Sequence, residues 1–219
     1  MRKDVRVAIE ARRAEGGTAS KILDVAERLV QLRGFNGFSY ADVAEELGIS
    51  KASLHYHFAG KAELGEALIE RYASRFTGSL DEIDARPIDA PAKLAAYAKL
   101  YGDVLRRKRM CLCGMLAAEY QTLPKPMRSA VVSFFDDQEV WLVGVLEQGR
   151  EQGTLRFSGS ASEAAQVIVG GLEGAMLVTR PYGDPARFQV AADHLLASFA
   201  ALPGLLGDRR GSAGGERRR

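Results

Sequence analysis

The chain has 219 residues, 47% of them hydrophobic, which is enough for one sizeable core or two smaller ones. The net charge is +2, and nine Lys and Arg against eight Asp and Glu over residues 1–60 leave only +1, so total charge does not indicate a nucleic-acid or membrane partner. Only two cysteines occur, there is no apolar leader segment, and no apolar run is long enough to cross a bilayer. We therefore expect a soluble cytoplasmic protein without disulfides.

The first expected elements are an arm and one helix. Residues 1–17 mix charged residues with alanine and end at a Gly-Gly pair, which predicts a flexible N-terminal arm. Beyond it, apolar residues recur at helical spacing up to Gly34. This pattern predicts a helix whose buried stripe consists of Ile22, Val25, Ala26 and Leu29.

Three short helices are expected next, over residues 41–48, 50–58 and 61–76. Ser39 is the expected cap of the first of them, with Asp42 three residues further on. After a proline-containing linker over residues 84–91, punctuation by Pro and Gly separates longer helices over about 92–108, 110–122, 125–152, 161–180 and 185–201.

The fold class expected from these patterns is all-α, because no alternation of apolar and polar residues persists long enough for a sheet. The expected domains are a flexible arm (1–17), an N-terminal helix-turn-helix domain (18–64), a larger C-terminal helical domain for effector binding and dimerisation (65–202), and a disordered tail rich in Gly and Arg (203–219).

The stretch ISKASLHYHFAGKAEL, residues 49–64, contains three adjacent ring side chains. Two short helices joined by a turn that contains Gly48 form a helix-turn-helix, in which apolar residues fill the space between the helices. On the outward side, Lys51 can reach a guanine edge, Ser53 can hydrogen-bond several bases, and Ala52 can touch a thymine methyl group. These three residues are the expected base contacts. The expected phosphate contacts, helped by the start of the next helix, are Ser39, Tyr40, His55, Tyr56, His57 and Lys61.

Other roles for the same stretch have less support. His55 and His57 point about 200° apart around a helix, so one metal ion does not easily bind both. No phosphate-binding glycine loop, metal-ligand cluster or plausible catalytic triad is visible, so we expect neither an enzyme nor a metal or other cofactor. An all-helical protein-interaction module that does not bind DNA remains the alternative.

The segment TASKILDVAERLVQLRGFNGFSYADVAEELGISKASLHYHFAGKAEL resembles the N-terminal domain of the TetR family of transcriptional regulators. The specific residues are the Gly48-Ile49-Ser50 turn, Leu54, the His57-Phe58 pair, Lys61 and Leu64. The resemblance implies a homodimer that binds double-stranded, palindromic operator DNA in successive major grooves about 34–36 Å apart. It also implies that a small-molecule effector in the C-terminal domain changes this spacing, usually releasing the DNA.

One position departs from the family pattern. The family usually has a tyrosine that contacts phosphate where this chain has His55. An imidazole donates the same hydrogen bond and carries charge when protonated. DNA binding is therefore expected to weaken with rising pH more steeply than in relatives with tyrosine.

Small residues in VIVGGLEGAMLV predict a close helix-helix contact. Gly170 and Gly174 lie four residues apart with Ala175 adjacent, and a glycine inside a helix costs roughly 1 kcal/mol against alanine, so a packing reason is expected. We expect these residues at the dimer interface, where two helices from each subunit form a four-helix bundle, as the resemblance also implies. Packing within one subunit is the alternative.

The stretch RRKRMCLCGMLAAEY contains both cysteines. Cys111 and Cys113 are two residues apart, so on a helix they point in different directions, which argues against a bond or a shared metal. A helix start and the basic residues 106–109 near Cys111 both favour a lowered thiol pKa and a reactive thiolate. The alternative is that each cysteine is a small buried hydrophobe.

The segment 111–128 also resembles a subgroup of TetR-type repressors that sense reactive electrophiles, unsaturated carbonyl compounds or acrylate-like acids. The resemblance places the sensor at Cys111, whereas Arg180 lies near where some members have a sensing lysine. Core packing is as good an explanation as ligand contact for the further expected pocket residues, Tyr97, Tyr101, Met115, Phe134 and Trp141. The predicted function is a repressor released from its operator by a small molecule. Reactive electrophiles and unsaturated acids are the candidates that the resemblance suggests, and an ordinary non-covalent inducer remains the alternative.

Overall fold

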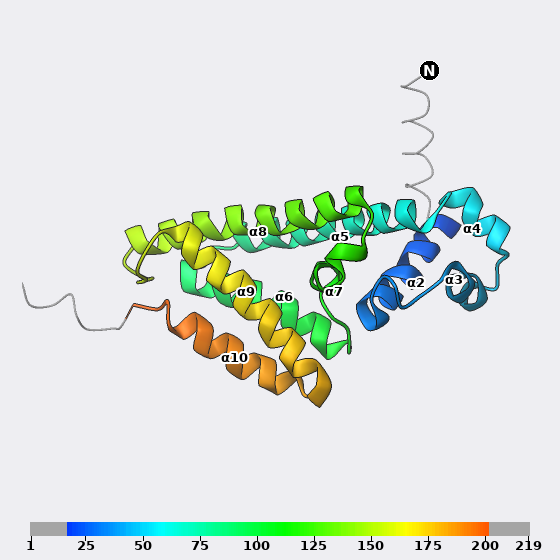
Figure 1. Ribbon diagram of the computed structural model, residues 1–219. Coiled ribbons are helices and arrows are strands. Elements are labelled where there is room, and N and C mark those ends of the chain that lie inside the picture. The colour runs from blue at the N-terminus through cyan, green and yellow to red at the C-terminus, as the bar shows by residue number, and fades with distance from the viewer. Residues whose placement is uncertain (1–16, 202–219) are drawn as a thin grey trace, which may run out of the picture.

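The computed structural model describes residues 17–201, and helices make up most of that range (Figure 1). The α-helices are α2 (Thr18–Arg33), α3 (Tyr40–Leu47), α4 (Lys51–His57), α5 (Lys61–Asp84), α6 (Ala90–Arg106), α7 (Leu112–Ala118), α8 (Lys125–Glu151), α9 (Ala161–Thr179) and α10 (Pro185–Ala197). Two 3-10 turns, η1 (Tyr120–Thr122) and η2 (Arg180–Tyr182), follow α7 and α9. The predicted all-α fold is confirmed, and the predicted arm and tail fall outside the described residues except for Gly17.

Helices α2, α3 and α4 gather at one end of the molecule around a core that includes Ile22, Val43 and Leu54 (Figure 1). The predicted cap of α3 is present: the Ser39 hydroxyl accepts from the Asp42 backbone N–H, and the Asp42 carboxylate accepts from the Ser39 backbone N–H at 2.7 Å. These local contacts fix where α3 starts and therefore how the helix-turn-helix is oriented.

The turn between α3 and α4 depends on two small residues. Gly48 adopts a left-handed conformation with φ of 64°, which ends α3. Ser50 then caps α4 by accepting a hydrogen bond from the Ser53 backbone N–H at 3.1 Å. A helix-turn-helix therefore forms where the sequence predicts it.

Helix α5 is longer than expected and runs through both parts of the molecule (Figure 1). The sequence predicts its end near Phe76, but the helix continues to Asp84 because Leu80 and Ile83 extend its buried stripe. The predicted helix over residues 110–122 is also wrong in extent, since α7 ends at Ala118 and η1 follows.

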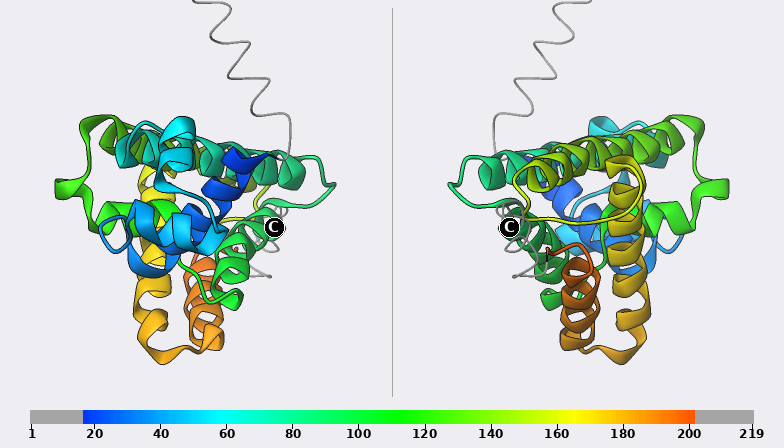
Figure 2. Two further views of the ribbon diagram at one scale, coloured as in Figure 1. Left: turned by 90° about the vertical axis from the view of Figure 1, so that its right-hand side faces the viewer. Right: turned by 90° about the vertical axis from the view of Figure 1, so that its left-hand side faces the viewer.

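The remaining helices form the larger body. Helix α9 packs between α8 and α10, and α6 packs against α5, α8 and α10 (Figure 2). The core between them includes Tyr97, Leu142 and Leu172, all fully buried. No helix in the described part of the chain is long and apolar enough to cross a membrane.

Candidate DNA-binding surface and effector site

Helix α4 presents its polar side to solvent. Lys51 and Ala52 are exposed and Ser53 is half-buried, while Leu54 is fully buried in the core. Because α4 starts at Lys51, these three side chains occupy its first turn, which is the part of a recognition helix that reaches base edges. The structure therefore presents the three predicted base-contact residues together on one surface.

The aromatic side chains at the end of α4 are also accessible. Tyr56 is 67% exposed, His55 is exposed and His57 is half-buried. The His55 Nδ1 lies 3.1 Å from the Ala59 carbonyl oxygen, which can only accept, so Nδ1 carries the proton. In the neutral imidazole, Nε2 is then an acceptor, and only the protonated ring donates from Nε2.

Three other predicted phosphate contacts are held by internal bonds. The Ser39 hydroxyl belongs to the cap of α3, and the Tyr40 hydroxyl donates to the Phe58 carbonyl oxygen at 3.1 Å. The Lys61 ammonium donates to the Phe38 carbonyl oxygen at 2.5 Å, and burial lowers its pKa. An ammonium has three donors, so this bond leaves Lys61 others for a phosphate.

In the larger body, Cys111 occupies a different environment from the predicted one. The Cys111 thiol is 1% exposed, its Sγ accepts from the Gly114 backbone N–H at 3.4 Å, and the Tyr72 hydroxyl donates to Sγ at 3.7 Å. Cys111 does start α7, as expected. The prediction of a lowered pKa is wrong, because burial and the nearby Glu173 carboxyl raise the pKa of the Cys111 thiol well above its ordinary value.

The thiol of Cys113 is also buried and has a raised pKa. It is fully buried, and burial followed by the charge of Glu173 raises the pKa of its thiol. The basic residues 106–108 are instead exposed at the end of α6, and none of them is among the groups that shift the pKa of either thiol. The basic run in the sequence therefore does not activate either cysteine.

Glu173 is the functional candidate that sequence reasoning missed. Burial raises the pKa of the Glu173 carboxyl to about 7, and the hydrogen bond with Cys111 opposes this effect. Its Oε1 is shielded from solvent and has no hydrogen-bonding partner. Gly114 makes the room, since a Cβ there would lie 2.2 Å from the Glu173 Oε2. One acid within the apolar run VIVGGLEGAMLV was the signal available in the sequence.

Two of the predicted pocket aromatics, Tyr97 and Tyr101, lie near this carboxyl, whose charge adds to burial in raising the pKa of both phenols. The hydroxyls of Tyr97 and Tyr101 both donate to the Gln138 Oε1, each at 2.7 Å, and all three side chains are buried. Trp141 stacks on Tyr97 with ring centroids 5.6 Å apart. Phe134 is also buried, and it packs against Tyr72 with ring centroids 5.6 Å apart. These contacts assemble residues that are far apart in the sequence.

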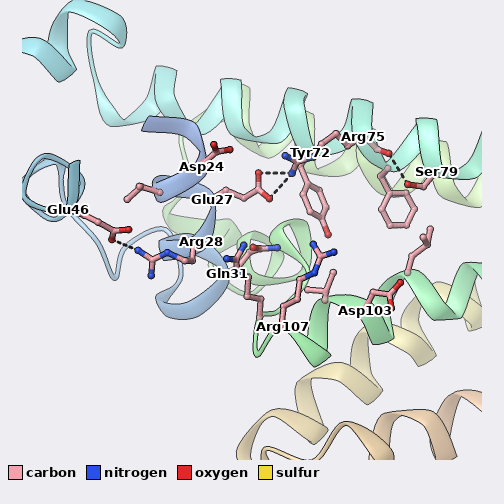
Figure 3. A pocket seen from close by; sticks show the side chains of 15 residues that line it. Asp24, Glu27, Arg28, Gln31, Glu46, Tyr72, Arg75, Ser79, Asp103 and Arg107 are labelled. Carbon is pink, nitrogen blue, oxygen red and sulfur yellow. Dashed lines mark hydrogen bonds and ion pairs between the residues drawn. The ribbon is translucent and has the colours of Figure 1, made fainter. Parts of the chain in front are cut away.

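Two hollows border this cluster. A groove of about 760 Å³ lies between α2, α5 and α6, where Gln31, Tyr72 and Arg107 are among its lining residues (Figure 3). A smaller hollow of about 310 Å³ is lined by Phe134, Gln138, Trp141 and further residues of α5 and α8. Tyr72 lines the groove and also bonds Cys111, so it separates the thiol from the larger hollow.

Helix α7 connects this region to the helix-turn-helix. Glu119, at the end of α7, accepts a hydrogen bond from the Phe35 backbone N–H at 2.6 Å. The Asn36 amide donates to the Thr122 hydroxyl at 2.7 Å. Since Cys111 caps the other end of α7, seven helical residues separate the thiol from the loop between α2 and α3.

The outer face of α9 is open. A Cβ at Gly170 or Gly174 would meet no atom within 4 Å, so packing within one subunit does not explain these glycines. Ala175 is half-buried and packs on the core side. Exposed apolar side chains continue this face at Val167, Leu177, Val178 and, on α10, Val190.

Comparisons with known proteins agree with this architecture. Residues 22–68 match the model for "Bacterial regulatory proteins, tetR family", and residues 90–195 match that for "Tetracyclin repressor-like, C-terminal domain". A TetR-family transcriptional regulator from Agrobacterium tumefaciens is 32% identical with a TM-score of 0.81, covering 84% of this chain and 97% of that one.

A second relative is the HTH-type transcriptional repressor NemR of Escherichia coli K12. It is 29% identical over 160 residues, which is 70% of this chain and 79% of NemR. A crystal structure of the reduced form of E. coli NemR has a TM-score of 0.76 and 26% identity, covering 85% of this chain and 99% of that one.

Proposed function

Because the chain belongs to the TetR family of bacterial regulatory proteins, we propose that it represses transcription as a homodimer bound to a palindromic operator. A small electrophile that adds to Cys111 would release it from the DNA. The proposed domains are the helix-turn-helix over residues 18–64 and the effector and dimerisation domain over 65–202. The observation that supports DNA binding most directly is the solvent-facing first turn of α4 with Lys51, Ala52 and Ser53.

DNA binding explains this surface better than a protein partner does. The exposed side of α4 has a lysine, a serine and two histidines, no acid, and a single large aromatic, Tyr56. Protein interfaces usually have an apolar centre, whereas phosphate and base edges require donors. The relatives named above are transcriptional regulators, so the all-helical interaction module is the less favoured alternative.

The open face of α9 and α10 supports the homodimer. Exposed apolar side chains surround Gly170 and Gly174, and the glycines allow a partner helix to approach closely. Contiguous apolar surface of this kind marks an interaction site. A second copy of the same face would bury it and set the distance between the two α4 helices.

Thiol sensing is supported by how α7 is anchored. An adduct on Cys111 does not fit the closely packed site, so α7 has to move. The other end of α7 holds the loop before α3 through Glu119 and Phe35, so this movement would change the orientation of the helix-turn-helix. The adduct acts as the effector because it favours the displaced state.

A DNA-binding titration tests the proposal. Fluorescence anisotropy with the DNA upstream of the gene should give affinity that falls with salt concentration, as phosphate contacts release counterions. N-ethylmaleimide should then release the DNA from the wild type and from Cys113→Ser, but not from Cys111→Ser. Release from Cys111→Ser at the wild-type level would leave a non-covalent effector in place of thiol sensing.

A further inference from the structure

We propose that Glu173 accepts the proton of the Cys111 thiol when an electrophile adds to it, and that this pair selects uncharged α,β-unsaturated carbonyl compounds over unsaturated acids. The inference rests on the proposed role of Cys111 as the sensor. It adds a second reacting residue to that site and decides between the two effector classes that the sequence leaves open.

The geometry of the site supports a proton transfer. Cys111, at the start of α7, and Glu173, on α9, meet at Gly114: the Gly114 backbone N–H lies 3.4 Å from the Cys111 Sγ, and a Cβ on Gly114 would lie 2.2 Å from the Glu173 Oε2. One carboxyl oxygen, Oε1, is buried without a partner, although a buried carboxyl that leaves an oxygen unbonded is costly. Gly114, one turn into α7, keeps the space beside the carboxyl free of a side chain. An unsatisfied oxygen maintained next to a thiol is an acceptor in place for its proton.

The groups around Glu173 leave no other obvious acceptor. The ionisable side chains that affect the pair or are affected by it are Cys113 of α7, Tyr72 of α5, and Tyr97 and Tyr101 of α6. Each of these is a thiol or a phenol whose pKa is raised by burial. From α8, the facing polar group is the neutral amide of Gln138. Near neutral pH the carboxylate is therefore the base of this cluster.

The thiol needs such a base. Burial raises the pKa of Cys111 well above its ordinary value, so the thiolate fraction at neutral pH is very small. The pKa of Glu173 is about 7, so a large part of the carboxyl is ionised at the same pH. A base whose pKa lies near the working pH is well suited to remove a proton as the sulfur attacks.

The reaction balances without an oxidant. The Cys111 sulfur forms a bond to the β-carbon of the unsaturated carbonyl compound, and the electron pair of the carbon-carbon double bond moves toward the carbonyl oxygen. The thiol proton passes to the Glu173 carboxylate and then to the α-carbon of the enolate. The product is a thioether, the carboxylate is restored, and no group leaves.

The same carboxylate determines which electrophiles enter. A negative charge brought beside a buried carboxylate is repelled and also loses its hydration. Two arginines near the site are engaged elsewhere: Arg75 pairs with Glu27, and Arg180 donates to the Leu32 carbonyl oxygen and to the Met115 sulfur. Arg107 and Arg109 line the outer groove, and neither is among the groups that shift the pKa of the Cys111 thiol. An unsaturated acid therefore meets repulsion where an uncharged enone does not.

Two maleimides with the same reacting ring test both parts. N-ethylmaleimide is uncharged, and N-(carboxymethyl)maleimide is an anion. The rate of addition to Cys111 is measured between pH 5.5 and 8.5 by mass spectrometry of the peptide that contains it. For the wild type, we expect a rise centred near pH 7 with N-ethylmaleimide and at least a tenfold slower reaction with the anion. In the same chain unfolded in urea, the rate should keep increasing up to pH 8.5 with the thiolate fraction of an ordinary cysteine, instead of showing a step centred near pH 7, and the preference between the probes should be lost.

Variants isolate the carboxyl. Glu173→Gln keeps the shape of the side chain and should slow the addition of N-ethylmaleimide at pH 7.5 about tenfold. The rate should then lose its step near pH 7, and the ratio between the rates of the two maleimides should become smaller. Glu173→Asp retains a carboxyl and should retain the rise at a lower rate. Glu147→Gln, an exposed position on α8, is the matched control and should react as the wild type does.

The outcomes separate this inference from the proposed function. Equal rates in the wild type and Glu173→Gln at every pH would overturn the role of Glu173, and equal rates for the two maleimides would overturn the selectivity. Operator release that persists in Cys111→Ser would instead overturn thiol sensing, even if Glu173 accelerates the addition. A Cys111 that reacts with neither probe would overturn both.

Discussion

The exposed side of α4 and the buried site around Cys111 both hold several polar groups close together, but they satisfy them differently. On α4, the side chains of Lys51 and Tyr56 face solvent, and DNA would contact them in the proposed complex. Around Cys111 there is no room for bulk water, so Tyr72 and Gly114 supply the bonds and one oxygen of Glu173 goes without. We infer that the exposed first turn of α4 suits a charged partner, whereas the unpartnered Glu173 oxygen costs stability and therefore suggests a role in a reaction or in ligand binding.

The largest effect is expected when the Glu173 carboxyl is replaced by a neutral amide, which removes the contrast between the two regions. The pKa of Glu173 is about 7 in the folded protein against an ordinary 4.5, so the folded chain binds the proton more tightly, and stability is lost as pH rises from about 4.5 through about 7. At about 1.4 kcal/mol for each pKa unit, Glu173→Gln should be more stable than the wild type by about 3 kcal/mol at pH 8. Urea unfolding at pH 5 and pH 8 measures this, and a difference that does not grow with pH would contradict it.

Removing one base contact tests the exposed side. Lys51→Ala should weaken operator binding by about 1–3 kcal/mol for each half-site and relax the preference at one base pair, as a lost base contact does. Competition anisotropy with single-base operator variants measures both effects. Lys21→Ala, an exposed lysine on α2, is the control. If Lys51→Ala left the operator affinity and the base preference unchanged, Lys51 would not be a base contact.

The hydrogen bond between Glu119 and the Phe35 backbone N–H connects the two regions, and it can be weakened without changing α4 or Cys111. Glu119→Gln loses the charge that binds the Phe35 backbone N–H, so the loop before α3 follows α7 less closely. We expect N-ethylmaleimide to modify Cys111 at the wild-type rate while operator release weakens by about 0.5–2 kcal/mol, the usual size of such coupling effects. Parallel measurement of adduct formation and anisotropy checks this. Loss of both together would show instead that Glu119 supports the reactive site itself.

The smallest expected effect concerns His55. Its Nδ1–H is bonded to the Ala59 carbonyl oxygen, so only the protonated ring donates from Nε2 to a phosphate. Operator affinity should therefore fall by a few-fold between pH 6 and pH 8 in the wild type, and His55→Tyr should reduce this fall. Anisotropy titrations at constant ionic strength measure it. Identical curves at the two pH values would exclude a phosphate contact by His55.

Local sequence patterns predicted the helix-turn-helix well. The Ser39 cap and the Gly48 turn involve residues a few positions apart, so composition and spacing are sufficient to predict them. The end of α5 was predicted too early although Leu80 and Ile83 continue its apolar stripe, because it is the larger body that buries these two residues. The break after Ala118 was missed for the same kind of reason, since Glu119 bonds a loop 84 positions earlier in the chain.

The reactive site shows the limit of such patterns more clearly. The basic run 106–109 next to Cys111 in the sequence indicated an activated thiolate, but folding exposes most of that run and buries the thiol. Glu173 comes close to Cys111 although 62 positions separate them in the sequence. Pairings of this kind depend on how α7 and α9 pack, which no local spacing specifies.

Helix α5 is a single long helix that joins the helix-turn-helix to the larger body. Its 24 residues, at about 1.5 Å each, make a rod about 36 Å long that begins beside α4 and ends beneath Trp141, whose indole N–H donates to Asp84. Tilting such a rod by about 5° at its far end carries the near end about 3 Å sideways, close to the rise of one base pair. In the proposed repressor, a small repacking of the helices around the far end of α5 would therefore be enough to misalign the two α4 helices with the DNA grooves, without unfolding the helix-turn-helix.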